Sequence, residues 1–182
     1  MAISPASIIE YWYSEPLKKH WFASTAALDK EIRDKFEDLW QKAASGALNH
    51  WTETAEGALA LVIIMDQFPL NMFRNQAKSF QTEQLAVAIA RQAIENKLDT
   101  RLAKDRLPFL YMPLMHSENL ADQDLSVRLY ELAGLESNLR FARHHREIIR
   151  QFGRFPHRNS ILNRHSTVQE QEYLNSKHAF KG

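Results

Sequence analysis

The sequence predicts an all-α fold, and three observations carry that prediction. Apolar residues recur at helical spacings of three and four along most of the 182 residues. No segment alternates apolar and polar residues as a half-buried strand does. Helix-capping residues such as Ser and Thr precede several of the apolar stripes. We therefore expect antiparallel helical hairpins, stacked in a single helical domain over residues 1–182, with a short terminal helix and tail from about residue 167.

The first half of the chain contains four predicted helices, over residues 5–15, 25–45, 54–68 and 80–96. Ser4 precedes Pro5, which is a capping residue followed by proline at the first helical position. The third helix is apolar on all sides between Ala58 and Met65, a pattern typical of a central buried helix. Pro69 follows it, and we expect this proline to end the helix.

The second half begins with a segment that the prolines make difficult to assign. Pro108 and Pro113 predict irregular structure over residues 99–118, with one short helical turn. Longer helices are then predicted over residues 119–135 and 138–153, the first with Ser117 as its N-cap. A capping box, Thr167-Val168-Gln169-Glu170, begins a short last helix.

The composition excludes several classes of protein. The absence of cysteine excludes disulfides, thiolate zinc sites, iron–sulfur clusters and cysteine nucleophiles. The five glycines are too scattered for a phosphate-binding Gly-rich loop. The longest apolar run, residues 58–65, is far shorter than the roughly 20 residues of a membrane span. The N-terminus carries no signal-peptide pattern, so we expect a cytoplasmic protein without a membrane partner.

The net charge of +1 conceals a polarised chain. Residues 140–165 contain seven arginines, no lysine and one acid, Glu147, which gives this window a net charge of +6. Arg146, Arg150 and Arg154 are spaced by four, so they repel one another along one helix face. Acidic groups must offset this repulsion. They belong either to a ligand or to neighbouring helices, in which case the arginines form a structural ion network.

One segment of this window is typical of a binding loop. In the sequence from Phe152 to Asn159, two aromatic residues alternate with cations around a Gly and a Pro. The Gly and Pro predict a helix end followed by a fixed turn, which would present polar groups from a rigid loop. The candidate ligand-binding residues here are Arg154, His157, Arg158, Asn159 and, further on, Arg164. The alternative is that the arginines only complement the negative end of the helix dipole.

Two other segments carry candidate acid/base groups. Asp66 follows eight apolar residues, so we expect it to be partly buried and either paired with a cation or used as a general base. His116 and Glu118 are further acid/base candidates. Three more residues complete the candidate ligand-binding set: Arg74, Gln123 and His145. His145 lies on the apolar stripe of its helix, where a satisfied core histidine is the alternative.

A metal site is a further possibility for the same side chains. His116, Glu118, His145 and Asp66 are types that bind metals, but their spacing matches no known metal motif. We therefore predict neither a metal nor a cofactor.

The segments DQFPLN (66–71), FLYMPLMHSE (109–118), HREII (145–149) and FGRFPHRN (152–159) resemble a bacterial family of uncharacterised proteins, domain-of-unknown-function family nine hundred and twenty-four. The resemblance spans nearly the whole chain. It implies a tetratricopeptide-like fold of stacked helical hairpins and no established reaction or cofactor. Leu70 and Asn163 depart from the family pattern, which often has Arg and Gly there. Asn163 can preserve the turn, because Asn tolerates a left-handed backbone.

Three hypotheses for function follow. The first is an inter-helix pocket for an anionic small molecule, a phosphate or a carboxylate. The second is a non-catalytic interaction scaffold, in which the Arg/His cluster is an ion network or binds an acidic peptide. RNA binding is the least favoured, because no RNA-binding motif is present and the isoelectric point is only about 8.0. Whether the protein is an enzyme, and its oligomeric state, are left open by the sequence.

Overall fold

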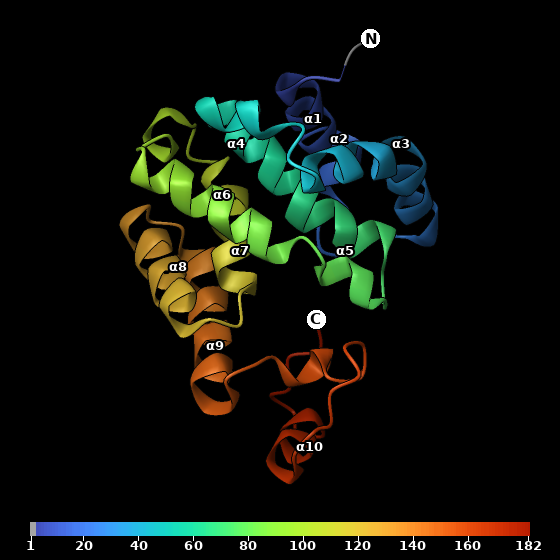
Figure 1. Cartoon of the computed structure of the whole chain (residues 1–182). Coiled ribbons are helices and arrows are strands. Elements are labelled where there is room, and N and C mark those ends of the chain that lie inside the picture. The colour runs from blue at the N-terminus through green and yellow to red at the C-terminus, as the bar shows by residue number, and fades with distance from the viewer. Residues whose placement is uncertain (1–2) are drawn as a thin grey trace. The chain divides into compact units, whose positions relative to one another are not determined.

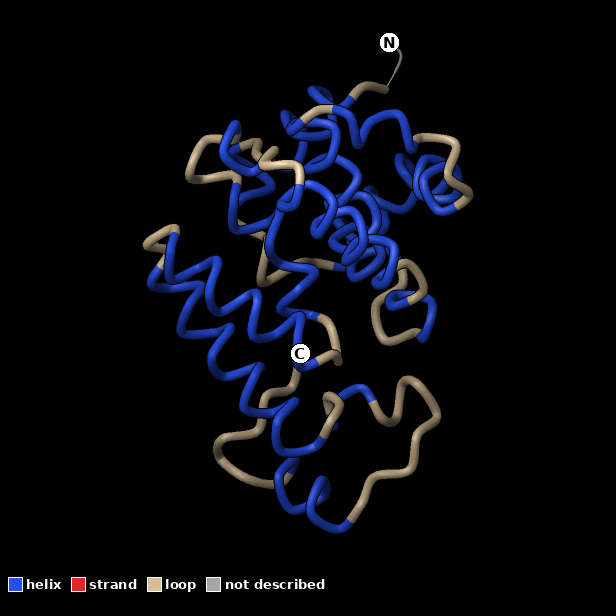
Figure 2. Tube along the Cα trace, turned by 60° about the vertical axis from the view of Figure 1, so that its left-hand side comes forward, coloured by secondary structure: helices blue, strands red, loops and turns tan. Residues whose placement is uncertain are grey.

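The structure is a computed structural model that describes residues 3–182. This part of the chain consists of helices and loops, without a strand (Figure 2), which confirms the all-α prediction. The chain divides into two compact units. Unit 1 extends to Arg74 and continues over Lys78–Pro113, and unit 2 comprises Asn75–Ala77 and Leu114–Gly182. The expectation of a single domain stays a prediction.

Unit 1 contains the helices of the first half of the chain (Figure 1). They are α1 (Pro5–Trp12), α2 (Glu15–Lys18), α3 (Ala26–Ala44), η1 (Asn49–Glu53), α4 (Ala55–Val62), η2 (Ile63–Gln67), α5 (Phe68–Met72), α6 (Glu83–Glu95) and η4 (Asp99–Arg101). The short helix η3 (Ala77–Phe80) and the helix α7 (Leu107–His116) each include the boundary between the units.

The centre of unit 1 is α4, as its apolar sequence predicts. Thr54 caps it by accepting a hydrogen bond from the N–H of Gly57, and every residue from Gly57 to Val62 is buried. The helix packs against α1 and α6. The buried indole N–H of Trp40 is hydrogen-bonded, since it donates from Nε1 to Thr82 Oγ1 at 2.9 Å.

The prediction that Pro69 ends the third helix is wrong. A single π-helical turn, η2, follows α4, and α5 then continues from Phe68 through Pro69 to Met72. Proline is tolerated there because it lies just after the π-turn, and the carbonyl of Met65, four residues before it, accepts a hydrogen bond from Thr82 Oγ1 at 2.6 Å.

The prediction of irregular structure over residues 99–118 is also wrong for its second half. Residues 107–116 form α7, with Pro108 near its start and Pro113 inside it. Proline fits a first turn, and the loss of one backbone hydrogen bond at Pro113 is offset by the burial of neighbours such as Phe109 and Leu114. The apolar content of the segment therefore outweighs its prolines.

Unit 2 is built on an antiparallel hairpin of α8 (Leu120–Leu132) and α9 (Glu136–Phe152), which lie side by side (Figure 1). Two further helices follow, η5 (Pro156–Arg158) and α10 (Val168–Leu174). Ile148, Ile149 and Phe155 form a buried apolar cluster, against which Phe152, Tyr173 and Phe180 pack. The hairpin expectation is confirmed here, as is the capping box of the last helix.

The N-cap of α8 differs from the prediction. Asn119, and not Ser117, caps the helix by accepting hydrogen bonds from the N–H groups of Ala121 and Asp122. Ser117 instead donates from Oγ to Asp122 at 2.6 Å, within the buried interior of unit 2. Both residue types favour caps, so the sequence alone does not distinguish them.

Candidate functional site

Glu118 is held by a fork of hydrogen bonds at the start of the α8 hairpin. Arg164 donates to both carboxylate oxygens, from Nη1 at 2.7 Å and from Nη2 at 2.9 Å. The backbone N–H of Phe155 donates to the same carboxylate at 2.7 Å. Parallel bonds of this kind are among the strongest polar contacts in proteins.

Glu170 is held in the same way on the other side of the loop. Arg154 donates to Glu170 from Nε at 2.7 Å and from Nη2 at 2.9 Å. The backbone N–H of Thr167 adds a bond of 2.7 Å, which completes the capping box of α10. The Glu170 side chain is only 3% exposed, so its charge depends on these partners.

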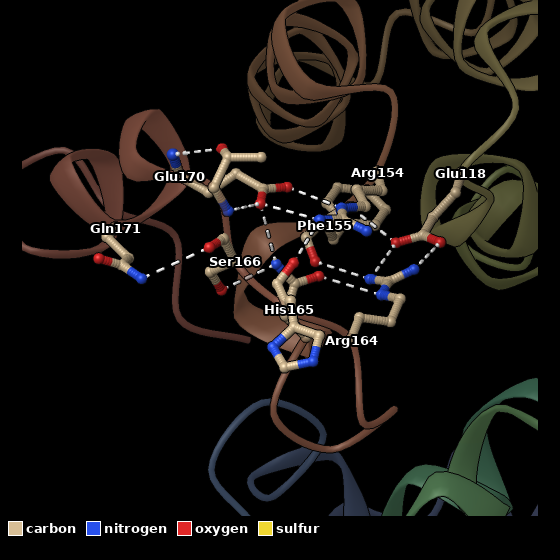
Figure 3. A network of polar contacts seen from close by, with 10 residues as sticks. Glu118, Arg154, Phe155, Arg164, His165, Ser166, Glu170 and Gln171 are labelled. Atoms are coloured by element: carbon tan, nitrogen blue, oxygen red, sulfur yellow. Dashed lines mark hydrogen bonds and ion pairs between the residues drawn. The ribbon is translucent and has the colours of Figure 1, made fainter.

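Asn159 joins the two ion pairs into one network. Figure 3 shows the pairs themselves, Glu118 with Arg164 and Glu170 with Arg154. Its Oδ1 accepts from Arg164 Nε at 3.0 Å, while its Nδ2 donates to Glu170 at 3.3 Å and to Ser166 Oγ at 3.0 Å. We call Glu118, Arg154, Asn159, Arg164 and Glu170 the Arg–Glu lattice. It connects the start of α8, the end of α9 and α10 within unit 2.

The backbone between these helices turns at two left-handed residues. Gly153 ends α9 with a φ of +69°, a conformation that glycine adopts without strain. Asn163 has a φ of +53°, as its expected role in the turn requires, and Arg164 N–H then donates to the carbonyl of Asn159 at 2.7 Å. These turns direct both guanidinium groups toward the glutamates.

The electrostatics of the lattice favour charged glutamates. Burial acts to raise the pKa of Glu118, but hydrogen bonds from Arg164 and from the Phe155 N–H bring it below its ordinary value. Hydrogen bonds from Arg154, partly opposed by burial, lower the pKa of Glu170 to about 2. Both carboxylates therefore stay ionised at neutral pH and compensate the arginines.

Three arginines of α9 also meet acids within unit 2. Arg143 pairs with Glu131 at 2.8 Å, and Arg146 lies 3.5 Å from Asp124, both acids being on α8. Arg150 pairs with Glu147 of its own helix at 3.4 Å. These contacts are more exposed than the lattice and contribute less to stability.

Two of the predicted histidines, His145 and His157, lie beside Phe155. His145 is buried and donates from Nδ1 to the carbonyl of Phe141 at 2.8 Å. Burial lowers the pKa of His145 to about 3, and burial followed by the charge of Arg158 lowers the pKa of His157 to about 4. Arg158 donates to the carbonyl of His116 at 2.9 Å and lies over the Phe155 ring at 4.7 Å.

Gln123 has a structural position in unit 2. It is fully buried and donates from Nε2 to the carbonyls of Met115 and Ser117, both at 2.7 Å. These bonds fasten the end of α7 to α8. Unit 2 thus brings together nine of the eleven predicted site residues, namely His116, Glu118, Gln123, His145, Arg154, His157, Arg158, Asn159 and Arg164.

The other two predicted site residues belong to unit 1. Asp66 is buried in the π-turn and accepts a hydrogen bond from Gln67. Arg74 pairs with Asp29, from Nε at 2.7 Å and from Nη2 at 3.2 Å, and Asn71 donates to the same carboxylate at 2.8 Å. Arg74 therefore fastens the end of α5 to the start of α3.

Two further residues of unit 2, Glu170 and Phe180, make contacts that the sequence does not indicate. The sequence marks Glu170 only as part of a capping box, and its pairing with Arg154 has no local signal in the sequence. Phe180 falls in the predicted tail, although it packs against His145 at 4.4 Å between ring centroids.

The described part of the chain contains neither a metal site nor a membrane-spanning helix. Within residues 3–182, no group of three or more His, Asp or Glu side chains is arranged to hold a metal ion. Over the same residues, no helix has the length and apolar character needed to cross a membrane.

Comparisons with known proteins identify the family and a related structure. The model of a family described as a bacterial protein of unknown function (DUF924) matches residues 8–178. A solved structure, that of the protein of unknown function ATU0120 from Agrobacterium tumefaciens, is 40% identical, with a TM-score of 0.87 over 94% of this chain and 96% of that chain. No curated protein matches. The chain therefore belongs to the bacterial DUF924 family of proteins of unknown function.

Proposed function

We propose that the protein is a non-catalytic helical scaffold in which the arginine cluster is an internal ion network. One observation carries this proposal: Arg154 and Arg164 each direct two N–H groups at a glutamate of the same unit. An external anion would have to displace Glu170 or Glu118, and each is already a well-matched anion for the guanidinium fork. The arginines are thus used in stabilising the fold.

Three titratable groups of unit 2, Glu118, His145 and His157, support a non-catalytic role. A general base works best when its pKa lies near the working pH. Hydrogen bonds from Arg164 and Phe155 keep the pKa of Glu118 below its ordinary value, even though burial opposes them. Burial lowers the pKa of His145 to about 3 and that of His157 to about 4. Groups with such pKa values are weak bases at neutral pH.

An anion pocket is the second candidate, and a specific cavity favours it. The cavity has a volume of about 330 Å³ and lies within unit 2, lined by Pro156, His157, Ser160, Ser166, Leu174 and Lys181. Hydroxyl groups and a lysine are suited to a phosphate or a carboxylate. The contacts of a bound anion would then come from these groups and not from the paired forks of the lattice.

Thermal unfolding in the presence of anions separates the two candidates. The scaffold proposal expects phosphate and citrate to raise the unfolding temperature no more than chloride does at equal ionic strength. A saturable rise would indicate binding to the folded state. If Lys181→Ala or Arg154→Ala abolishes that rise while the variant stays folded, the scaffold proposal is wrong. Lys177→Ala is the matched control, since Lys177 is an exposed cation of the same segment.

A further inference from the structure

Two polar side chains of α8, Gln123 and Ser126, are completely buried, and each carries an oxygen atom that no protein group satisfies. Both residues are 0% exposed. Among residues 3–182, no group forms a hydrogen bond with Gln123 Oε1 or with Ser126 Oγ. Buried polar atoms without a hydrogen bond are rare in native proteins, because they lose their hydration and gain nothing in return. These two oxygens therefore require a further partner.

The orientation of the Gln123 amide is fixed by its nitrogen atom. Nε2 donates to the carbonyl oxygens of Met115 and Ser117, both at 2.7 Å, and these bonds use both N–H groups of the amide. Exchanging the oxygen and the nitrogen would place Oε1 against two carbonyl oxygens, with no proton between them. Oε1 is therefore an acceptor, and its partner must be a hydrogen-bond donor.

The two unsatisfied oxygens lie on one face of α8. Residues three apart in an α-helix are neighbours, with Cβ atoms about 5–6 Å apart, and their side chains lie one above the other. A serine within a helix often donates to the carbonyl four residues before it, here that of Asp122, but Ser126 makes no such bond. Its hydroxyl group is thus available to a small molecule that also reaches Gln123.

We propose that the buried face of α8 binds a single water molecule, which donates a hydrogen bond to Gln123 Oε1 and accepts one from Ser126 Oγ. Water both donates and accepts, and internal waters typically make about three hydrogen bonds to polar groups that have no other partner. The site goes beyond the scaffold function and does not depend on the arginine cluster.

The bound water completes the polar joint between α7 and α8. Gln123 already holds the carbonyls at the end of α7. Ser117 Oγ donates to Asp122 Oδ2 at 2.6 Å and accepts from the N–H of Asn119 at 3.2 Å. Glu118 of the Arg–Glu lattice lies within this joint, between Ser117 and Asn119. A water on Gln123 satisfies the remaining acceptor of the amide that holds the two helices together.

The sign of the effect of Ser126→Ala on the urea midpoint tests the proposal. With the water in place, the substitution removes one of its hydrogen bonds and should lower the midpoint. Without a water, the same substitution removes an unsatisfied buried hydroxyl group and should raise the midpoint.

A matched control is needed because alanine favours a helix more than serine does. Arg128 is exposed on the same helix, so the difference between Arg128→Ala and Arg128→Ser measures this gain alone. Once that gain is subtracted, we expect a lower midpoint for Ser126→Ala than for the unchanged protein. A corrected midpoint that is equal or higher would overturn the proposal.

A crystal structure of the unchanged protein, at a resolution that orders internal waters, gives a second and direct readout. We expect density for one water about 2.7–3.2 Å from both Gln123 Oε1 and Ser126 Oγ. Empty space between these atoms, or a bond from Ser126 to the Asp122 carbonyl, would overturn the proposal. A urea midpoint that differs between sodium and potassium chloride at equal concentration would assign the density to a cation and also overturn it. Neither measurement involves Arg154 or Lys181, so this proposal and the scaffold function fail separately.

Discussion

The side-chain amide of Asn159 donates to the carboxylate of Glu170 at 3.3 Å while its carbonyl oxygen accepts from Arg164 at 3.0 Å. One buried asparagine, 1% exposed, therefore links the two arginine–glutamate pairs through hydrogen bonds. We therefore expect the Arg–Glu lattice to act as a single network, in which the loss of one member weakens the contacts of the others.

Replacing this asparagine with a residue of similar size tests the linkage. Asn159→Leu should lower the free energy of unfolding by about 1–3 kcal/mol, because it leaves buried donors and acceptors without partners. Urea denaturation monitored by circular dichroism gives this value. Gln169→Leu, at an exposed position of α10, is the matched control and should change stability by less than about 0.5 kcal/mol. Similar values for both variants would exclude a structural role for Asn159.

The buried histidines should make stability fall as the solution becomes acidic. The pKa of His145 is lowered from 6.5 to about 3 and that of His157 from 6.5 to about 4, mainly by burial. Below pH 6.5 the unfolded state therefore binds more protons than the folded state, so acid favours unfolding until the folded pKa values are reached. Glu170 extends the loss below its ordinary pKa of 4.5 toward about 2, since it must be ionised to keep its hydrogen bonds with Arg154.

Urea midpoints measured between about pH 7 and pH 4 check this dependence. His145→Phe should flatten the slope of stability against pH, because one of the histidines that takes up a proton only on unfolding is removed. His178→Phe, at an exposed position, is the matched control. An unchanged slope in His145→Phe would show that His145 is accessible to protons in the folded protein.

The two left-handed turns make a prediction about backbone strain. Gly153 has a φ of +69° and no atom within 4 Å of the position that a Cβ would take, so Gly153→Ala should cost about 1–2 kcal/mol through backbone conformation alone. Asn163→Gly should be neutral within about 0.5 kcal/mol, whereas Asn163→Val should destabilise the protein, because its φ of +53° disfavours a branched side chain. Thermal unfolding would measure all three. A neutral Asn163→Val variant would contradict the turn geometry.

The parts of the fold that depend on local pattern are predictable from the sequence. The helices α3, α4 and α9 follow from apolar spacing and from cap residues such as Thr25 and Thr54. The helix α7 is not predictable in this way, because Pro113 suggests a break while the burial of its neighbours is a tertiary effect.

The sequence predicts that arginines are concentrated at the site, but it does not predict which acidic residue pairs with which arginine. The excess of arginine in residues 140–165 requires acidic partners, and the sequence does not say which. Glu118 lies 46 residues from Arg164, and Glu170 lies 16 residues from Arg154, distances at which no helical periodicity applies. The packing of Phe180 on His145 depends in the same way on tertiary structure.

The most direct test of the central claim is a double-mutant cycle on Glu118 and Arg164, with Glu118→Gln and Arg164→Met measured singly and together by urea denaturation. The side chains are 26% and 22% exposed, and we expect a coupling energy above about 1 kcal/mol. The exposed pair of Arg143 and Glu131 is the matched control, for which about 0.2–1 kcal/mol is expected. A Glu118–Arg164 coupling no larger than that of the surface pair would contradict the claim that the cluster is a stabilising internal network.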